Sequence, residues 1–401
     1  MRKKIVLQIK LSNGSYEKKM KEYSKKEMEI IFKTRRNVLA DYLTQNEIGA
    51  CVFIDAEEHR DPNLAYYSNF SSDAILIIYN TGYSILIPWD ENLAKLNAFC
   101  DKIIPYTRYA NDKYNALKAV LSSNTSKAKF ERIELPPYLT YIEYLKFIDK
   151  LNNFTCRCSE YGAHKFVTDC RLIKDEYEIE CTKEACRVGD LILDEIENQI
   201  KAGTITTETD VALLIERMLR ENGCQRTGFD TLAAGPSRSF AIHAFPGYTA
   251  NPWPAQGLSI LDFGVVYNGY TSDQTVTIAQ GPLTEDQEKQ LSLVQKAYDE
   301  CVKLYVPGKP ICEAAKTADM IFAKEKRKMP HTLGHAIGLE IHEFPRVSVK
   351  TESSLTFKPG MILTCEPGLY HEEIGGCRLE NDVLITEEGN EILTHSRIIR
   401  I

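Results

Sequence analysis

An Asn-Gly pair inside the segment LSILDFGVVYNGYTSDQTVTIAQ, residues 258–280, constrains the fold more than any other feature of the sequence. Asn268 and Gly269 separate two strand-like runs, which is the strongest short-range signal for a β-hairpin with a two-residue turn. A turn of this length places Tyr267 opposite Tyr270 and so fixes the pairing of every residue further out. The sequence therefore predicts both a hairpin and its register.

This register brings two carboxylates together. Counting outward from the turn places Gly264 opposite Asp273, and Asp262 lies two residues before Gly264. Because side chains alternate between the two faces of a strand, Asp262 and Asp273 share a face as diagonal neighbours, roughly 7 Å apart at the backbone. Such a pair repels unless positive charge lies between its members, and two divalent ions about 3.5–4 Å apart fit that gap. Taken alone, the pair is also compatible with turn or surface chemistry.

A second acidic region follows in GMILTCEPGLYHEEIGGCRLENDVLIT. Glu366 ends one apolar run, and Glu380 interrupts another, which follows a predicted glycine turn at 375–376. Alternation places Arg378, Glu380 and Asp382 on one face of that strand. A carboxylate inside such a strand should be paired or metal-bound, because a lone buried charge is very unfavourable. An ion pair between Glu380 and Arg378 on a solvated face is the alternative.

The segment HTLGHAIGLEIHEFP, residues 331–345, holds three of the eight histidines of the chain. His331 and His335 are four residues apart, as in the zincin helix, but the glutamate of that motif is absent and the interspersed glycines disfavour a helix. The run AIGLEIHEF alternates instead, which predicts a strand that turns His342 away from the core. A structural role is the alternative for any single histidine, but three histidines between two acidic regions favour a functional site.

The rest of the chain divides into two sections with different patterns. Up to about residue 150, a helical spacing of apolar residues over 27–43 precedes buried strand-like runs, which predicts an α/β packing domain without a cluster of catalytic residue types. Afterwards, two predicted helices are followed by strands, and the same order then occurs again, which indicates an internal duplication. These later helices are predicted over 174–201, 207–222 and 284–304, with a fourth ending near 327.

Composition excludes several classes of function. A formal net charge of −7 disfavours a nucleic-acid surface, which needs clustered excess Lys and Arg. The apolar run at the start is broken by Gln8 and Lys10, so we expect no export signal, and no run is long enough to cross a membrane. Twelve cysteines without a C-x-x-C pair are typical of free thiols in a reducing compartment, so we expect a cytoplasmic protein.

Taken in order and spacing, several motifs resemble the pita-bread metallopeptidases, the family of prolidase and aminopeptidase P. The motifs are RLIKDEYEIE, LDFG, GYTSD, HTLGHAIGLEIHE, MILTCEPGLY and GCRLENDVLIT, over about 170–401. RRNVLADYL and LAYYSNF, within 30–150, look more loosely like the creatinase-type N-terminal domain of these enzymes. The resemblance implies an α/β (α+β) fold with an N-terminal extension at 1–28, a creatinase-like domain at 29–160, and a pita-bread catalytic domain at 161–401 with an internal pseudo-twofold repeat.

The resemblance also implies a metal site. The five metal ligands of the family fall on Asp262, Asp273, His335, Glu366 and Glu380. By resemblance, Asp273 and Glu380 bridge two ions, Asp262 completes one, and the other two ligands complete the second. Four carboxylates and one imidazole make a hard, oxygen-rich donor set. We therefore expect two divalent ions, with Mn²⁺ favoured and Zn²⁺, Co²⁺ or Fe²⁺ as alternatives.

Further positions carry over to catalysis and substrate binding. Glu366 is expected to accept and relay the proton, and His243 and His342 to position the substrate and stabilise developing charge. The positions that contact substrate in the family match His331, Tyr370 and Arg378.

The resemblance implies a peptidase that cleaves before proline at the N-terminal residue of Xaa-Pro dipeptides or short peptides, and a homodimer formed through the N-terminal domain. It leaves the preference between dipeptides and longer peptides open. Two alternatives use the same fold: a binding protein whose metal site has decayed, and a metal-free creatinase-like hydrolase. The intact set of five ligands disfavours both.

The sequence departs from the family pattern beside two of the expected ligands. Gln274 follows Asp273, and Val276 stands where arginine is usual, which weakens the case for a charge network behind that ligand. Cys365 and Cys377 replace commoner apolar residues, which predicts sensitivity to oxidation.

Overall fold

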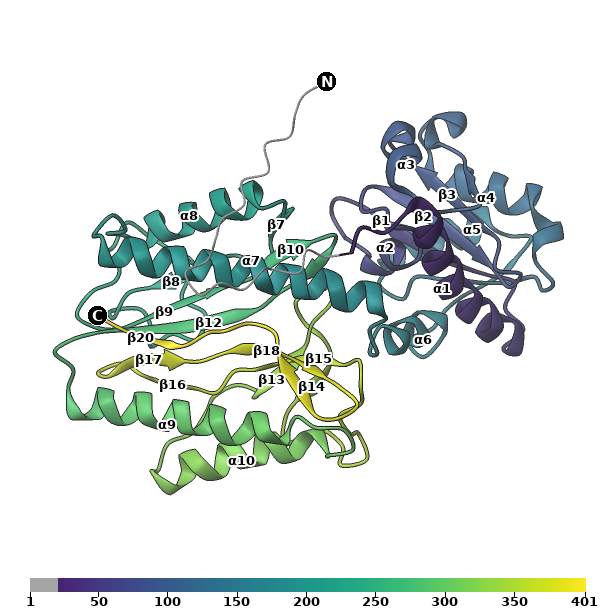
Figure 1. The fold of residues 1–401 in the computed structure, drawn as a ribbon. Coiled ribbons are helices and arrows are strands. Elements are labelled where there is room, and N and C mark those ends of the chain that lie inside the picture. The colour runs from purple at the N-terminus through teal and green to yellow at the C-terminus, as the bar shows by residue number, and fades with distance from the viewer. Residues whose placement is uncertain (1–20) are drawn as a thin grey trace.

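The computed structural model describes residues 21–401, which form a smaller N-terminal lobe and a larger C-terminal lobe (Figure 1). The predicted extension at 1–28 lies mostly outside the described residues. The first helix begins at Lys25, where Ser24 accepts a hydrogen bond from the backbone N–H of Glu27 and so caps the helix.

The smaller lobe is built on one six-stranded sheet with the order β4-β3-β2-β1-β5-β6. Helices cover both faces of this sheet, which explains why β1 and β2 are buried along their whole length. Its elements are α1 (Lys25–Gln45), β1 (Ala50–Asp55), α2 (Pro62–Ser68), β2 (Ala74–Tyr79), β3 (Ser84–Pro88), α3 (Glu91–Asn97), β4 (Lys102–Ile103), η1 (Tyr106–Tyr109), α4 (Lys113–Ser123), η2 (Thr125–Lys127), β5 (Arg132–Leu135), α5 (Tyr141–Lys150), β6 (Thr155–Cys158) and α6 (Ala163–Cys170).

Helix α6 belongs to the smaller lobe by its packing. Ala163 and Val167 lie in the same hydrophobic cluster as Leu39 of α1 and Phe53 of β1. The division of the chain at residue 160 remains a prediction, and the packing of α6 favours a boundary after Cys170.

The larger lobe places two pairs of helices around sheets that are antiparallel except for the parallel pair β12–β20. One four-stranded sheet has the order β20-β12-β9-β8, and a five-stranded sheet has the order β14-β13-β15-β18-β19. The elements are α7 (Glu176–Lys201), α8 (Glu208–Glu221), β7 (Arg226–Thr227), β8 (Leu232–Ala234), β9 (Gly257–Phe263), β10 (Val265–Tyr267), β11 (Tyr270–Thr271), β12 (Gln274–Gln280), α9 (Glu285–Cys301), η3 (Val302–Leu304), α10 (Ile311–Lys324), β13 (Gly334–Ala336), β14 (Glu343–Val347), β15 (Ile362–Cys365), β16 (Gly368–His371), β17 (Gly375–Arg378), β18 (Asn381–Ile385), β19 (Asn390–Ile392) and β20 (Ile398–Arg400).

The expected duplication is present in this lobe. Helices α7 and α8 precede β8, β9 and β12, and helices α9 and α10 precede β13, β15 and β18. The two helix pairs lie on opposite sides of the strands in Figure 1. An antiparallel bridge between Thr275 and Glu380 joins the two halves at their centre.

The hairpin predicted from the Asn-Gly pair is confirmed with its register. Tyr267 pairs with Tyr270 at the turn, and Asp262 pairs with Thr275 further out. Asn268 adopts a left-handed conformation with φ 48°, as this tight turn requires.

Two local predictions are wrong. The turn before β17 lies at 372–374 rather than at 375–376, because Gly375 already pairs with His371 in the ladder. The run AIGLEIHEF is not one strand: β13 ends at Ala336 after a register shift, and residues 337–342 form an irregular loop before β14.

Cys365 and Cys377 are fully buried, and burial raises the pKa of both thiols, that of Cys377 to about 12. The structure thus contradicts the expected sensitivity to oxidation, which needs an accessible thiolate. No helix within residues 21–401 is both long and apolar enough to span a bilayer.

A buried ionic network joins the lobes beside the loop at 337–342. Arg171, which follows α6, lies 2.5 Å from the carboxylate of Glu343 and 2.8 Å from that of Glu340. It also donates to the side chain of Asn63 on α2, at 2.8 Å. Lys174 lies 3.1 Å from Glu343 on its other side.

This network makes stability depend on acidity. Burial raises the pKa of Glu343, but Lys174 and Arg171 outweigh burial and lower the pKa from 4.5 to about 2. Because the folded-state pKa lies below the unfolded one, the stabilisation is complete above about pH 4.5 and is lost as the pH falls towards 2.

We therefore predict that Glu343→Gln destabilises the protein most at neutral pH. The difference in unfolding free energy between the two proteins should shrink between about pH 5 and pH 3.5, as measured by urea titration. A difference that stays constant or grows on acidification would contradict the ionic origin of the contact.

Candidate metal centre

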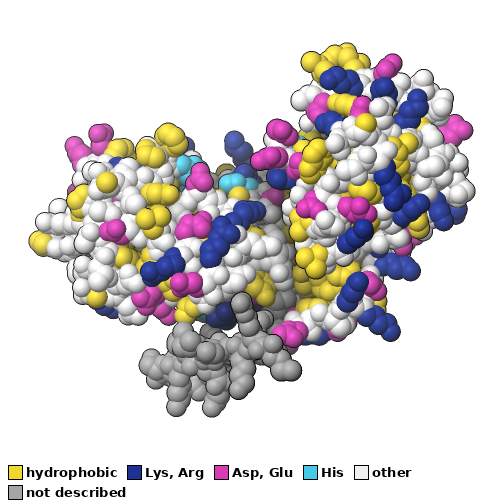
Figure 2. All heavy atoms as spheres, turned by 90° about the horizontal axis from the view of Figure 1, so that it is seen from above, with side chains coloured by type: hydrophobic (Ala, Val, Ile, Leu, Met, Phe, Trp, Pro, Cys, Tyr) yellow, Lys and Arg dark blue, Asp and Glu magenta, His cyan; other side chains and the backbone are white. Residues whose placement is uncertain are grey.

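The larger lobe contains a cavity of about 390 Å³. All five expected metal ligands line this cavity, although they come from separate elements. In chain order they are Asp262 near the end of β9, Asp273 just before β12, His335 in β13, Glu366 just after β15, and Glu380 between β17 and β18. In Figure 2, histidine side chains reach the surface of the larger lobe beside the hollow between the lobes.

Backbone pairing explains how the two halves of the duplication bring their carboxylates together. The β9–β12 register makes Asp262 and Asp273 diagonal neighbours on one face, as the sequence predicts. At the bridge between the halves, the hydroxyl of Thr275 donates to the carboxylate of Glu380 at 2.6 Å. Glu380 thereby faces the same cavity as the two aspartates.

Three donor atoms of this group lie close enough to share one ion. One ligand atom from each of Asp273, His335 and Glu380 lies within 4.8 Å of the others. His335 Nε2 is 3.6 Å from a carboxylate oxygen of Asp273 and 3.5 Å from one of Glu366. These separations are too long for good hydrogen bonds, but they suit donor atoms around a cation.

His335 has the tautomer that a metal ligand needs. Its Nδ1 lies 3.3 Å from the carbonyl oxygen of Ala336, which can only accept, so Nδ1 carries the proton. Burial, with a contribution from His342, lowers the pKa of His335 to about 3. The neutral ring therefore points the lone pair of Nε2 at the carboxylates.

The carboxylates are electrostatically unfavourable without a cation. Burial and then repulsion from neighbouring carboxylates raise the pKa values of Asp273 and Glu380 well above their usual range. Burial raises the pKa of Glu366 to about 8. In addition, Asp262 Oδ1 is buried without a hydrogen-bond partner among residues 21–401. A hard divalent cation would satisfy these groups, so the residues present fit the expected metal.

Arg378 is buried within the site and supplies positive charge. It donates to Asp262 at 2.5 Å through Nη2, to Tyr370 at 2.7 Å through Nη1, and to Thr275 at 3.0 Å through Nε. It does not pair with Glu380, which was the alternative for this strand. Because its donors hold other site residues in place, a direct contact between Arg378 and substrate remains a prediction.

Tyr370 continues this hydrogen-bond chain to His331. The tyrosine hydroxyl accepts from Arg378 and donates to His331 Nε2 at 3.0 Å, while Nδ1 of the histidine donates to the carbonyl of Thr332 at 2.8 Å. Burial lowers the pKa of His331 to about 4, so the ring is neutral. His331 lines the cavity, whereas Tyr370 lies behind it.

His243 and His342 line the cavity from two loops. The ring of His342 packs edge-on against that of His335, with centroids 4.4 Å apart. Both side chains are exposed, unlike the neighbouring imidazoles of His331 and His335. They are therefore free to meet a molecule that enters the cavity.

Sequence reasoning missed several residues of the cavity wall. Arg346 of β14 pairs with His335 across the β13–β14 ladder and lines the cavity. No carboxylate within residues 21–401 forms an ion pair with it. Phe229, Ile341 and Phe245 add apolar surface, and Phe245 is 95% exposed at the mouth. A motif search does not detect these residues, because the ladder register brings Arg346 to the site and the fold of separate loops brings the three apolar side chains.

Several known proteins that match this chain are peptidases. The model of metallopeptidase family M24 matches residues 180–387. An Xaa-Pro dipeptidase of Pyrococcus horikoshii is 31% identical over 361 residues, which cover 89% of this chain and 95% of the relative. An Xaa-Pro dipeptidase of Pyrococcus furiosus is 37% identical over 236 residues, which cover 57% of this chain and 64% of the relative.

Solved structures of similar proteins have the same architecture. The prolidase of P. horikoshii superposes with a TM-score of 0.78 at 26% identity and covers 91% of this chain and 99% of its own. The X-Pro aminopeptidase of Thermotoga maritima superposes with a TM-score of 0.77 at 25% identity. This match covers 88% of the present chain and 98% of the aminopeptidase. These matches confirm the fold class expected from the sequence, and the family model spans more than half of the chain. The chain therefore belongs to metallopeptidase family M24.

Proposed function

We propose that this chain is a dinuclear metal-dependent peptidase that hydrolyses the bond before proline at the N-terminal residue of Xaa-Pro dipeptides or short peptides. The convergence of Asp262, Asp273, His335, Glu366 and Glu380 on one cavity is the observation that carries the proposal. The names of the Pyrococcus relatives support the Xaa-Pro bond as the target.

The proposed occupants are two divalent ions, with Mn²⁺ favoured by the oxygen-rich donor set. Asp273 and Glu380 would bridge them, Asp262 would complete one, and His335 and Glu366 the other. When bound, such a pair supplies a water of lowered pKa and polarises the scissile carbonyl.

The side chains of the cavity would manage protons and orientation. The Glu366 carboxylate would accept a proton from the attacking water and return it to the leaving imino group. His243 and His342, both exposed to the cavity, would donate hydrogen bonds to the charge that develops on the carbonyl oxygen. The apolar side chains of Phe229, Leu232 and Ile341 offer a surface for the proline ring.

Arg346 supports a preference for dipeptides. Its guanidinium lies on the cavity wall and has no ion-pair partner in the described part of the chain. Such a group suits a free carboxylate, which a Xaa-Pro dipeptide carries directly on its proline. In a longer peptide the same position holds a neutral amide.

We further propose a cytoplasmic homodimer. All twelve cysteines are free, which supports a reducing compartment. The dimer rests on the family resemblance, with exposed apolar side chains such as Trp89 and Tyr141 on the N-terminal lobe as support.

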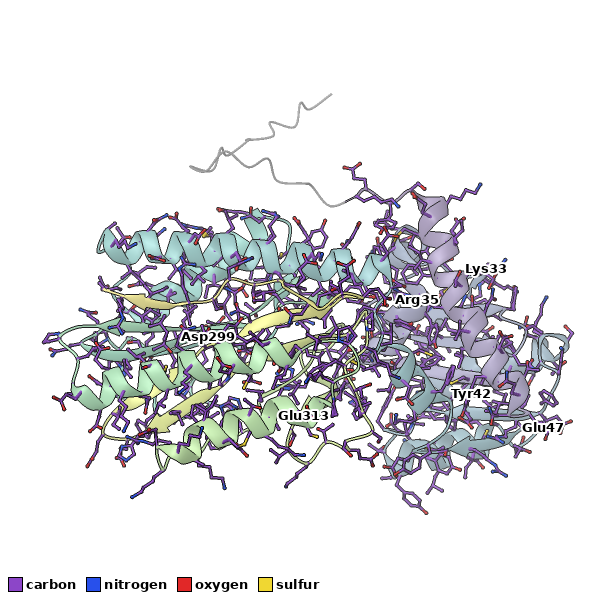
Figure 3. The ribbon with its side chains drawn as sticks, turned by 60° about the horizontal axis from the view of Figure 1, so that its bottom comes forward. Lys33, Arg35, Tyr42, Glu47, Asp299 and Glu313 are labelled. Carbon is purple, nitrogen blue, oxygen red and sulfur yellow. The ribbon has the colours of Figure 1, made fainter. Side chains whose placement is uncertain are left out.

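Of the predictions that follow from the proposed function, the first concerns the number of ions. We expect two Mn²⁺ per chain and loss of Ala-Pro hydrolysis on chelation, with recovery when Mn²⁺ is returned. Asp262→Asn should retain one ion, because the remaining ligands still surround the second position. Asp299→Asn on α9, a carboxylate remote from the cavity and labelled in Figure 3, should retain both. Elemental analysis of the three proteins measures this, and one ion in the unchanged protein would refute a dinuclear centre.

The second prediction concerns the proton acceptor. Glu366→Gln should lower kcat for Ala-Pro by about 10²- to 10⁴-fold, because an amide cannot take up the proton. Steady-state kinetics with parallel metal analysis distinguishes proton transfer from loss of an ion. Near-normal turnover in this variant would rule out the assignment.

The third prediction concerns Arg346. Arg346→Met should raise KM for Ala-Pro by about 10- to 100-fold, because one charge-assisted contact is lost. Ala-Pro-amide and Ala-Pro-Ala lack a carboxylate on the proline and should be affected little. Equal losses on all three substrates would show that Arg346 does not read that carboxylate.

A further inference from the structure

The loop at 337–342 contributes to the cavity but contains none of the expected metal ligands. It carries Ile341 and His342 into the cavity, yet it lies outside the strand ladders on either side. We propose that Glu343 is a positioning residue that holds this loop, and hence His342, in place for the reaction. The inference rests on the proposed function for its catalytic consequence.

The loop makes backbone hydrogen bonds near its start, from Ile337 to Ile362 and from Gly338 to Glu340. Glu343 adds a side-chain acceptor to them. Its Oε1 accepts the N–H of Leu339 at 3.0 Å, and its side chain is only 6% exposed. Gly338 makes this approach possible, since a Cβ at that position would lie 2.6 Å from the same oxygen. The carboxylate therefore fixes the start of the loop from inside.

Two buried cations fix the carboxylate in turn. Arg171 and Lys174 lie on either side of Glu343, and their side chains are 4% and 1% exposed. Removing one member of such a buried group leaves an uncompensated charge, so the group holds its geometry strongly. Arg171 also pairs with Glu340, which lies within the loop itself.

The same network ties the loop to the N-terminal lobe. Arg171 donates to Asn63 of α2, and the backbone N–H of Lys174 donates to Gly360 at 2.9 Å. The position of the loop is thus set where the lobes meet. The N-terminal lobe thereby influences the geometry of the cavity, although none of its described residues lines the cavity.

A second inter-lobe contact provides a control. Arg35 of α1 lies 2.7 Å from Asp175 and 3.5 Å from Glu178, at the start of α7. Figure 3 shows Arg35 where α1 meets the larger lobe. Like Arg171, this arginine is buried between the lobes, but no hydrogen bond or ion pair joins it to the loop at 337–342.

A double-mutant cycle tests the proposal on the Mn²⁺-loaded protein with Ala-Pro. Glu343→Gln keeps an acceptor for Leu339 but loses the ion pairs, and should lower kcat/KM by about 10- to 100-fold with metal content unchanged. In the Glu343→Gln background, His342→Ala should lower kcat/KM about tenfold less than it does in the otherwise unchanged protein, because the histidine is already misplaced. In an Arg35→Met background, His342→Ala should keep its full effect. An equal effect of His342→Ala on kcat/KM in the unchanged protein and in both variant backgrounds would overturn the proposal.

A second pair of variants avoids buried unpaired charge, in case Glu343→Gln does not fold. Gly338→Ala should displace the loop and reproduce the coupling to His342, whereas Gly389→Ala, with open space around its Cβ, should not. Hydrogen exchange of the segment 337–343 reports the loop without any activity. It should speed up in Glu343→Gln and Gly338→Ala only; unchanged exchange in both would refute the positioning role. Faster exchange in a protein that never cleaves Ala-Pro would instead refute the proposed function alone.

Discussion

Burial of carboxylates that also repel one another is the constraint on which the rest of this structure depends. Asp273, Glu366 and Glu380 face one cavity with raised pKa values, and Asp262 reaches it with an unpartnered oxygen. Arg378 supplies one positive charge and His335 is neutral, so the site retains a demand for cations. A chain that folds into this arrangement alone holds unfavourable charge, and the proposed divalent ions would offset it.

The scaffold meets this demand through registers rather than through local motifs. The β9–β12 ladder supplies two carboxylates, and the bridge between Thr275 and Glu380 brings the second half of the duplication against the first. Charged contacts at the lobe junction then hold the loop that bears His342. The residues that hold the cavity wall are therefore different from the proposed metal ligands. The pairing of the strands positions the carboxylates, and their proximity creates the candidate metal site.

Local patterns predicted what short-range physics determines. The Asn-Gly turn fixed the hairpin register, and helix caps and apolar periodicity marked the repeated helix pairs. The loop at 337–342 was predicted as a strand, but the N–H of Leu339 donates to the side chain of Glu343 instead of to a neighbouring strand. The carboxylate of Glu343 is held by Arg171, some 170 residues earlier in the chain, which no local pattern indicates. The sequence patterns did not identify Arg346, because its position opposite His335 depends on an irregular ladder. The family resemblance supplied the five ligands, and no local pattern alone would have joined them.

Anomalous X-ray scattering from crystals of the Mn²⁺-loaded protein tests the central claim most directly. The account predicts two manganese peaks about 3.5–4 Å apart, both between Asp273 and Glu380, with Asp262 turned towards one of them and His335 towards the other. A single peak, or manganese bound away from this cavity, would contradict it.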